Sequence, residues 1–131
     1  MAQDLFSVKG KVAIITGGLG QLGRQFSLAL VDRGAKVAIF DIQVDEQWVT
    51  ERFAGRLIDD NLMFVRVDIT QRRSIEAGLS QVNAKWGVPH ALINNAALDS
   101  PPNAPVEENG PFESYPESSW DKVIEVSVKG A

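Results

Sequence analysis

The chain has 131 residues, of which 44% are hydrophobic and 23% are charged, so we expect one globular domain. Its formal net charge of −4 and isoelectric point near 4.9 argue against nucleic acid or an anionic membrane surface as a partner. The absence of cysteine excludes disulfides, a cysteine nucleophile and thiolate metal sites. The single histidine, His90, has no partner histidine with which to bind a metal, so we expect no metal site.

The amino-terminal ten residues contain an early acidic residue and no long apolar core, so we expect no secretory signal. No apolar stretch approaches the roughly 20 residues that a membrane span needs. Because the lack of cysteine also fits a reducing compartment, these features together favour a cytoplasmic protein. We expect Leu5, Phe6 and Val8 in the polar lead-in to tuck beneath the sheet.

Short apolar runs alternate with amphipathic stretches along the chain, which is the pattern of an α/β fold. The apolar runs predict strands at residues 11–16, 36–41, 62–67 and 90–94. The amphipathic stretches predict helices at residues 21–33, 44–58, 71–86 and from 120 to the end. We interpret the apolar stripes of the middle two helices as core, with members Val49, Phe53 and Leu57, then Ile75, Leu79, Val82 and Trp86.

Three glycines follow the first predicted strand, at Gly17, Gly20 and Gly23, and a helical pattern begins directly after them. A strand, a glycine-rich turn and a helix form the front half of a dinucleotide-binding unit. Glycine permits a sharp turn, a close approach of the backbone to a pyrophosphate, and tight packing of helix on strand. The alternative interpretation is an ordinary strand–turn–helix whose glycines only make the turn.

An acidic residue, Asp41, stands 18 residues after Gly23 at the end of the second predicted strand. A carboxylate near this spacing can accept hydrogen bonds from the ribose hydroxyls of NAD. The alternative is a solvated residue at a strand end. The glycine turn and Asp41 together favour the dinucleotide interpretation.

The composition changes at residues 98–119, which hold five of the six prolines and five acidic residues but no Lys or Arg. A loop of this length without secondary structure is usually functional or disordered. It follows the fourth predicted strand and therefore lies at the carboxyl end of the sheet, where open α/β folds bind ligands. A ligand-binding loop and a mobile solvated loop both remain open.

Five motifs in chain order resemble those of the short-chain dehydrogenase/reductases, and they span almost the whole sequence. They are TGGLGQLG at Thr16 to Gly23, Asp41, VDIT at Val67 to Thr70, NNAA at Asn94 to Ala97, and WDKVIEVSVKG at Trp120 to Gly130. Three positions depart from the family pattern. Gln21 stands where the single-domain branch of the family has glycine, and Ala97 replaces the glycine that ends the family's NNAG motif. Ser127 occupies the position of the asparagine in the family's catalytic tetrad.

This resemblance implies a Rossmann-type parallel sheet of order 3-2-1-4 with helices on both faces, truncated before strand five, so that residues 1–131 form an incomplete domain. It also implies an NAD-dependent oxidoreductase that transfers hydride between NAD and a small alcohol or ketone, and a homo-oligomer. The residues implied to bind NAD are Gly17, Gly20, Gln21, Leu22, Gly23, Asp41, Asp68, Ile69, Asn95 and Ala96.

No catalytic residue is assigned in this sequence. The family's serine and Tyr-x-x-x-Lys segment lies beyond the matched region, and the single tyrosine, Tyr115, is followed four residues later by Ser119. Serine at position 127 also lacks the amide of the tetrad asparagine. Two further hypotheses therefore stand: a non-catalytic NAD-binding or interaction module and, because of the Gly20 spacing, a sugar epimerase or dehydratase of the extended branch.

Without a fifth strand, residues 91–94 are expected to form an exposed sheet edge. We expect Trp120, Val123 and Ile124 to cover part of the sheet, and Val126 and Val128 to have no second helix beside them. The sequence thus predicts a marginally stable chain that dimerises through this strand and the last helix, or aggregates.

Overall fold

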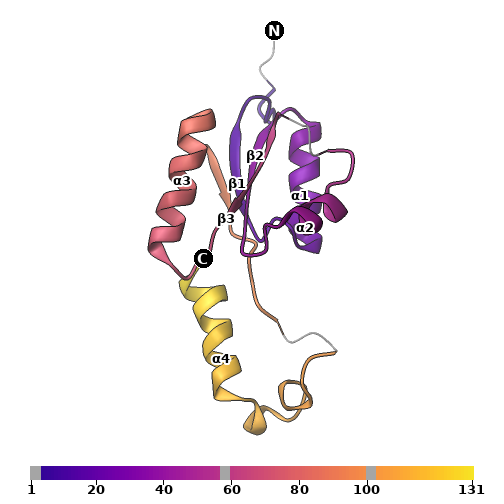
Figure 1. Ribbon diagram of the computed structural model, residues 1–131, viewed down its shortest axis with the longest axis vertical. Helices are drawn as coiled ribbons and strands as arrows, with labels where there is room; N and C mark the ends of the chain where they lie inside the picture. Colours follow the sequence, from indigo (N-terminus) through magenta and orange to yellow (C-terminus); the bar gives the residue numbers. More distant parts are fainter. Residues whose placement is uncertain (1–3, 57–59, 100–102) are drawn as a thin grey trace.

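A computed structural model describes residues 4–56, 60–99 and 103–131. Four parallel strands form one sheet in the order β3-β2-β1-β4, as predicted (Figure 1). The strands are β1 (Val12–Thr16), β2 (Lys36–Asp41), β3 (Leu62–Arg66) and β4 (Ala91–Ile93). Because all pairs are parallel, the carboxyl ends of the four strands meet at one edge of the sheet.

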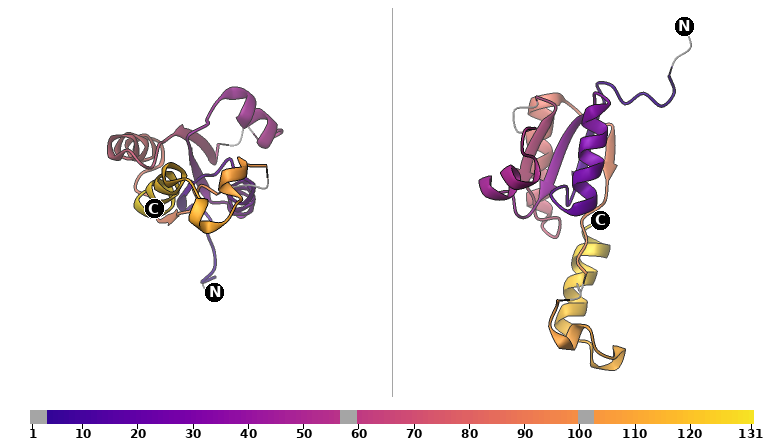
Figure 2. Two further views of the ribbon diagram at one scale, coloured as in Figure 1. Left: turned by 90° about the horizontal axis from the view of Figure 1, so that it is seen from below. Right: turned by 90° about the vertical axis from the view of Figure 1, so that its right-hand side faces the viewer.

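Helices cover both faces of the sheet (Figures 1 and 2). On one side lie α1 (Gln21–Asp32) and α2 (Glu46–Arg52), and on the other lies α3 (Arg72–Trp86). The central strands are rich in β-branched residues and are buried from both sides, as parallel strands between helices usually are. The expected α/β fold with helices on both faces is confirmed.

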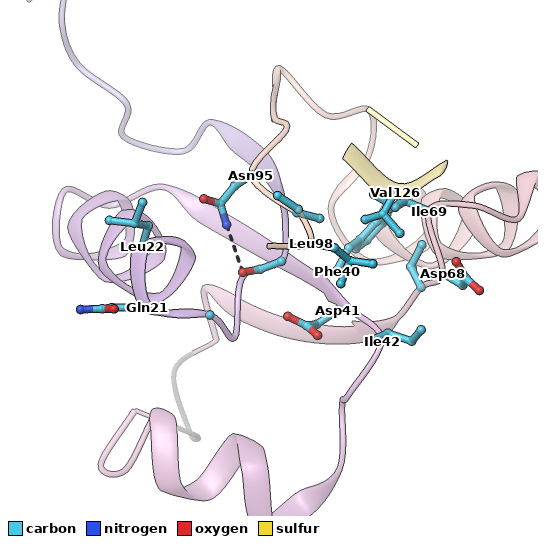
Figure 3. Close-up of a pocket in the computed structure, with 15 residues that line it drawn as sticks. Gln21, Leu22, Phe40, Asp41, Ile42, Asp68, Ile69, Asn95, Leu98 and Val126 are labelled. Atoms are coloured by element: carbon cyan, nitrogen blue, oxygen red, sulfur yellow. Dashed lines mark hydrogen bonds between the residues drawn. The ribbon is translucent and has the colours of Figure 1, made fainter. Parts of the chain in front are cut away.

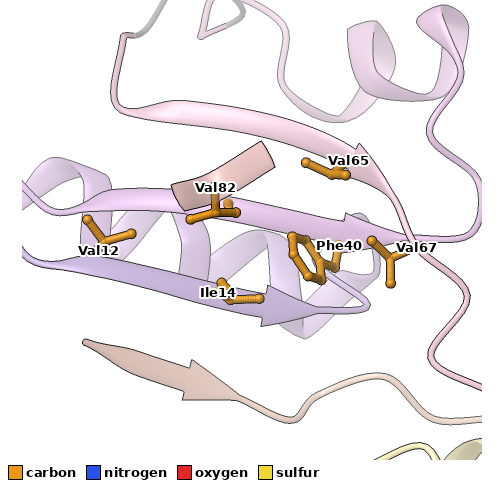
Figure 4. Close-up of a cluster of buried hydrophobic side chains, with 7 residues drawn as sticks. Val12, Ile14, Phe40, Val65, Val67 and Val82 are labelled. Atoms are coloured by element: carbon orange, nitrogen blue, oxygen red, sulfur yellow. The ribbon is translucent and has the colours of Figure 1, made fainter. Parts of the chain in front are cut away.

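The alternation of side chains along the strands divides the core into two clusters. The cluster beneath α3 unites Val82 with side chains from three strands and the turn after β3, namely Val12, Ile14, Ala38, Phe40, Val65 and Val67 (Figure 4). The opposite cluster lies beneath α1 and α2 and consists of Ile15, Leu19, Val31, Val37, Ile39, Phe53 and Leu62.

Helix α2 is shorter than the predicted segment 44–58. It begins after Asp45, whose carboxylate accepts the Trp48 N–H at 2.9 Å, and it ends before Phe53. Phe53 is only 1% exposed, as its place in the apolar stripe predicts. Leu57, the last member of that stripe, lies outside the described residues.

Two expectations about apolar side chains are wrong. Leu5 and Phe6 do not tuck beneath the sheet but are 86% and 90% exposed, whereas Val8 is half-buried. Ile75 and Leu79 on α3 are also exposed, because the helix lies mainly over β2 and β3 and these two side chains border a cavity between the helix and β4. Of the predicted α3 stripe, only Val82 is fully buried.

The last part of the chain extends beyond the carboxyl ends of the strands (Figures 1 and 2). The proline-rich segment contains two short 3-10 helices, η1 (Val106–Glu108) and η2 (Phe112–Ser114), and α4 (Glu117–Ile124) continues into a π-helical turn, η3 (Glu125–Lys129). The expectation that Trp120 covers the sheet is wrong. Its ring packs edge-on against the Phe112 ring, with 6.4 Å between the two ring centroids.

Within the three described ranges, no helix is both long and apolar enough to cross a membrane.

Candidate cofactor-binding site

A cavity of about 490 Å³ lies at the carboxyl ends of the strands β1 to β4 (Figure 3). The segments that follow all four strands meet there, and the π-helical turn η3 approaches from the far side. The residues that line it are Gly17, Gly20, Gln21, Leu22, Phe40, Asp41, Ile42, Val67, Asp68, Ile69, Asn95, Ala96, Ala97, Leu98 and Val126.

Two glycines of the first turn are required by the geometry. Gly17 has φ of +64°, and a Cβ there would lie 2.8 Å from the Ala96 Cα. A Cβ on Gly23 would lie 2.4 Å from the Gly17 carbonyl oxygen. Gly23 therefore lies beneath the turn and lets α1 pack against it, whereas Gly17 and Gly20 form part of the cavity wall.

The amino end of α1 is open to an anion. Gly20 is its N-cap and has no side chain to bond the first-turn amides, and the first turn contains no acidic residue. Gln21 and Leu22 begin the helix and line the cavity. A helix N-terminus with free amides and a positive dipole end is a favourable position for a phosphate group.

Asp41 lies at the end of β2 with both carboxylate oxygens in use. Oδ2 accepts the Leu19 N–H from the glycine turn at 3.1 Å, and Oδ1 accepts the Gln43 N–H at 3.2 Å. The carboxylate is partly buried and faces the cavity between the turn and Ile42 (Figure 3). Its remaining acceptor positions can take hydrogen bonds from ribose hydroxyls.

The segment after β3 forms the next part of the wall. Asp68 Oδ1 accepts both the N–H and the hydroxyl of Thr70, at 2.9 and 2.7 Å, and its main-chain N–H donates to the Ser74 hydroxyl at 2.9 Å. This closed turn presents Ile69 to the cavity. The apolar side chain of Ile69 beside a carboxylate suits the face and edge of a purine base.

A hydroxyl in β1 joins the first turn to the end of β4. Thr16 Oγ1 accepts the main-chain N–H groups of Asn95 and Ala96 at 3.1 and 3.0 Å. The Asn95 side-chain amide donates to the carbonyls of Thr16 and Gly17, both at 3.1 Å. These bonds fix the wall of the cavity opposite Asp68.

Ser127, at the position of the family's asparagine, lies on η3 and accepts the Leu98 N–H through its hydroxyl at 3.2 Å. The preceding residue, Val126, lines the cavity beside Ile69 (Figure 3). Ser127 therefore bonds the π-helical turn to the segment that leaves β4.

Nine of the ten residues predicted to bind a cofactor line this one cavity, and Gly23 supports it from below. The prediction missed Phe40, Ile42, Val67, Ala97, Leu98 and Val126. Most of these adjoin residues that were predicted, so the strand-end positions themselves could have indicated them. Across the part of the chain that the structure describes, no three His, Asp or Glu side chains gather closely enough to hold a metal ion.

The fold and the site define a dinucleotide-binding α/β protein, and comparison with known families is more specific. Residues 11–131 match the family model for short chain dehydrogenases, so the chain belongs to the short-chain dehydrogenase family. The expected family resemblance is confirmed.

Curated relatives carry dehydrogenase names. A sorbitol dehydrogenase of Cereibacter sphaeroides is 31% identical over 121 residues, which is 92% of this chain and 43% of the relative. An NAD-dependent glycerol dehydrogenase of Listeria innocua is 28% identical over 126 residues, or 96% of this chain and 45% of the relative. The chain thus spans less than half the length of these curated relatives.

Solved structures agree with the fold. A 3-ketoacyl-(acyl-carrier-protein) reductase from Brucella melitensis complexed with NADH matches with a TM-score of 0.78 and 28% identity, over 95% of this chain and 47% of that protein. A short-chain dehydrogenase/reductase from Burkholderia phymatum in complex with NAD has the same TM-score and 26% identity, over 96% and 42%.

Proposed function

We propose that this chain is the cofactor-binding half of an NAD-dependent oxidoreductase that acts on a small alcohol or ketone. The observation that carries the proposal is the single cavity in which the glycine turn, Asp41, the Asp68–Ile69 turn and Asn95 meet. Its volume lies within the range of about 300–1,000 Å³ that is usual for small-molecule sites. The family and the NADH and NAD complexes of its structural neighbours support the same assignment.

The residues present fit a dinucleotide from one end to the other. Gln21 and Leu22 offer their main-chain amides to the pyrophosphate. These amides are accessible because the N-cap, Gly20, has no side chain to bond them. Asp41 accepts hydrogen bonds from the adenosine ribose, and Ile69 contacts the adenine. When bound, the nicotinamide ring supplies hydride exchange with the substrate carbon. Asn95 and Ala96 border the cavity on the nicotinamide side.

We propose NAD rather than NADP as the cofactor because of Asp41. Its carboxylate accepts a hydrogen bond from a free 2′-hydroxyl and repels a 2′-phosphate. No Lys or Arg lies between Thr16 and Gly23 to bind such a phosphate. We expect Asp41→Ala to narrow the difference in binding free energy between the two dinucleotides by roughly 1–3 kcal/mol, the range for a charged hydrogen bond.

Calorimetric titration of the chain with NAD and with NADP tests this proposal. Asp121→Ala is a matched control, because that carboxylate is exposed on α4 and lies outside the cavity-lining set. The control should bind both dinucleotides like the unchanged chain. Tighter binding of NADP than NAD by the unchanged chain would contradict the assignment.

A non-catalytic NAD-binding module is the second candidate. It is favoured by Ser127, which stands where the family has asparagine. The coding sequence past codon 131 distinguishes the two candidates. A downstream serine and Tyr-x-x-x-Lys in frame would support the oxidoreductase, and a stop codon would support the module. In either case we propose a cytoplasmic homo-oligomer.

A further inference from the structure

Asp41 is held by a series of hydrogen bonds that begins on helix α2, outside the cavity. The Trp48 indole Nε1–H donates to the Gln43 side-chain oxygen across 2.7 Å. The Gln43 main-chain N–H donates to Asp41 Oδ1 across 3.2 Å, and the other carboxylate oxygen accepts the Leu19 N–H at 3.1 Å. The carboxylate is therefore fixed between the glycine turn and the start of α2.

The Trp48 ring is itself held in place. It is half-buried and packs against the core cluster beneath α1 and α2. The Arg52 guanidinium lies over the ring, with its central carbon 4.1 Å from the ring centroid. Arg24 on α1 donates through Nε to the Arg52 main-chain carbonyl and so joins the two helices. The indole N–H consequently points in one direction, toward Gln43.

Gln43 links Trp48 to Asp41 through hydrogen bonds. Its side chain is bonded to Trp48 while its main-chain amide is bonded to the carboxylate, so one residue connects the two. A carboxylate offers about four acceptor positions, and the two amides occupy one on each oxygen. A carboxylate held in this way loses little orientational freedom when a ribose binds, which favours affinity.

We propose that Trp48 and Gln43 are positioning residues that orient Asp41 and thereby set the preference of the site for NAD over NADP. The inference rests on the proposed function. Neither side chain is among the described residues that line the cavity, so both act through Asp41 rather than by contact with the cofactor.

Three substitutions separate this role from simple support of α2. Trp48→Phe keeps an aromatic ring for the core and for Arg52 but removes the indole N–H. Gln43→Leu removes the acceptor of that N–H and keeps the main-chain amide. Gln43→Glu retains a side-chain oxygen at the same reach, so it should restore the bond to Trp48 and with it the affinity for NAD.

The experiment is a calorimetric titration of each variant with NAD and with NADP, with a thermal melt of each variant. We expect Trp48→Phe and Gln43→Leu to weaken NAD binding about 2- to 10-fold, the effect of one hydrogen bond. The affinity for NADP should fall less, because the 2′-phosphate gains nothing from an oriented carboxylate. Gln43→Glu should bind NAD within about twofold of the unchanged chain.

Gln47→Leu is the matched control on the same helix. It removes an exposed bond of the same type, from Gln47 Nε2 to Glu51 Oε1 at 2.9 Å, and should leave both affinities unchanged. Equal loss of NAD and NADP binding in Trp48→Phe, or a lower melting temperature with an unchanged preference, would overturn the inference alone. Failure of the unchanged chain to bind either dinucleotide would overturn the proposed function instead.

Discussion

The two faces of the sheet are covered to different extents. On the face beneath α1 and α2, Ile15, Ile39 and Phe53 are at most 1% exposed. On the other face α3 is the one helix among the described residues that provides cover, and Leu92 of β4 remains 59% exposed. A second cavity of about 480 Å³ lies there, between α3 and β4, and Gly130–Ala131 at the end of the chain border it. We refer to this region as the open face.

The difference shows that an apolar stripe in the sequence predicts which side of a helix faces the sheet. It does not predict which side chains of the stripe become buried. The stripe of α3 is wider than the part of the sheet beneath it, so Ile75 and Leu79 border the open face with Leu92 instead of entering a core. Apolar area left in water forgoes about 25 cal/mol per Å² of stabilisation. A partner that covered the open face would therefore recover part of this stabilisation.

The sharpest test of this difference is a pair of truncations, one on each face. Phe53→Ala on the closed face should lower the free energy of unfolding by about 3–5 kcal/mol, because it leaves a cavity in a packed core. Leu92→Ala should cost less than about 1 kcal/mol, because that side chain already contacts water. Urea unfolding measures both. Equal losses in the free energy of unfolding would mean that Leu92 is buried in solution.

A charge placed on the open face tests its role in association. We expect the unchanged chain to form dimers or larger species through β4 and the last helix, since β4 pairs with β1 alone among the described strands. Leu92→Lys should shift the distribution toward monomer, because a buried unpaired ammonium is costly. Light scattering over a concentration series, with thermal melts, provides the measurement.

Ala84→Lys on the solvent side of α3 is the control for that charge change, since Ala84 is uncharged and exposed and does not border the second cavity. A monomeric unchanged chain, with a melting temperature independent of concentration, would contradict the expected association.

The smallest expected effect lies where η3 meets the segment after β4, next to the open face. Ser127→Ala removes the acceptor of the Leu98 N–H and should weaken this attachment by about 0.5–1.5 kcal/mol. Limited proteolysis after Leu98 should then be about 2- to 10-fold faster, because local opening becomes more frequent. Ser80→Ala, which removes an exposed bond within α3, should not change the cleavage rate.

Most strand positions could be predicted because parallel strands buried on both sides appear as uninterrupted apolar runs, whereas the sheet order was predicted from the family resemblance. Val12–Thr16 is such a run, and all five of its residues are buried. The start of α2 is set by a local cap at Asp45, which apolar periodicity alone does not mark. The end of α2 before Phe53, which is buried in the core beneath α1 and α2, could not be predicted because it depends on tertiary contacts. The position of α4 was missed for the same reason, since Trp120 is apolar enough for a sheet but packs on Phe112.

Within the candidate site, the predictable residues are those whose role depends on the backbone. Gly17 and Gly23 are required by close main-chain contacts, and such requirements appear in sequence as fixed spacing. Val126 lines the cavity only because of where η3 packs, and no local sequence pattern predicts that position. The bond from Trp48 to Gln43 depends on two side-chain conformations and was likewise invisible in the sequence.

The hydroxyl of Thr16 has a thermodynamic consequence. It bonds the two amides that follow β4, while the glycine turn begins at the very next residue, so the edge strand cannot detach without disturbing the turn. By mass action, a ligand present at 100 times its dissociation constant adds about 2.7 kcal/mol to any opening that destroys its site. Dinucleotide binding at the turn is thereby linked to the edge of the sheet. The amide protons of β4, which belong to the least covered strand, should gain the most protection from hydrogen exchange when the cofactor binds.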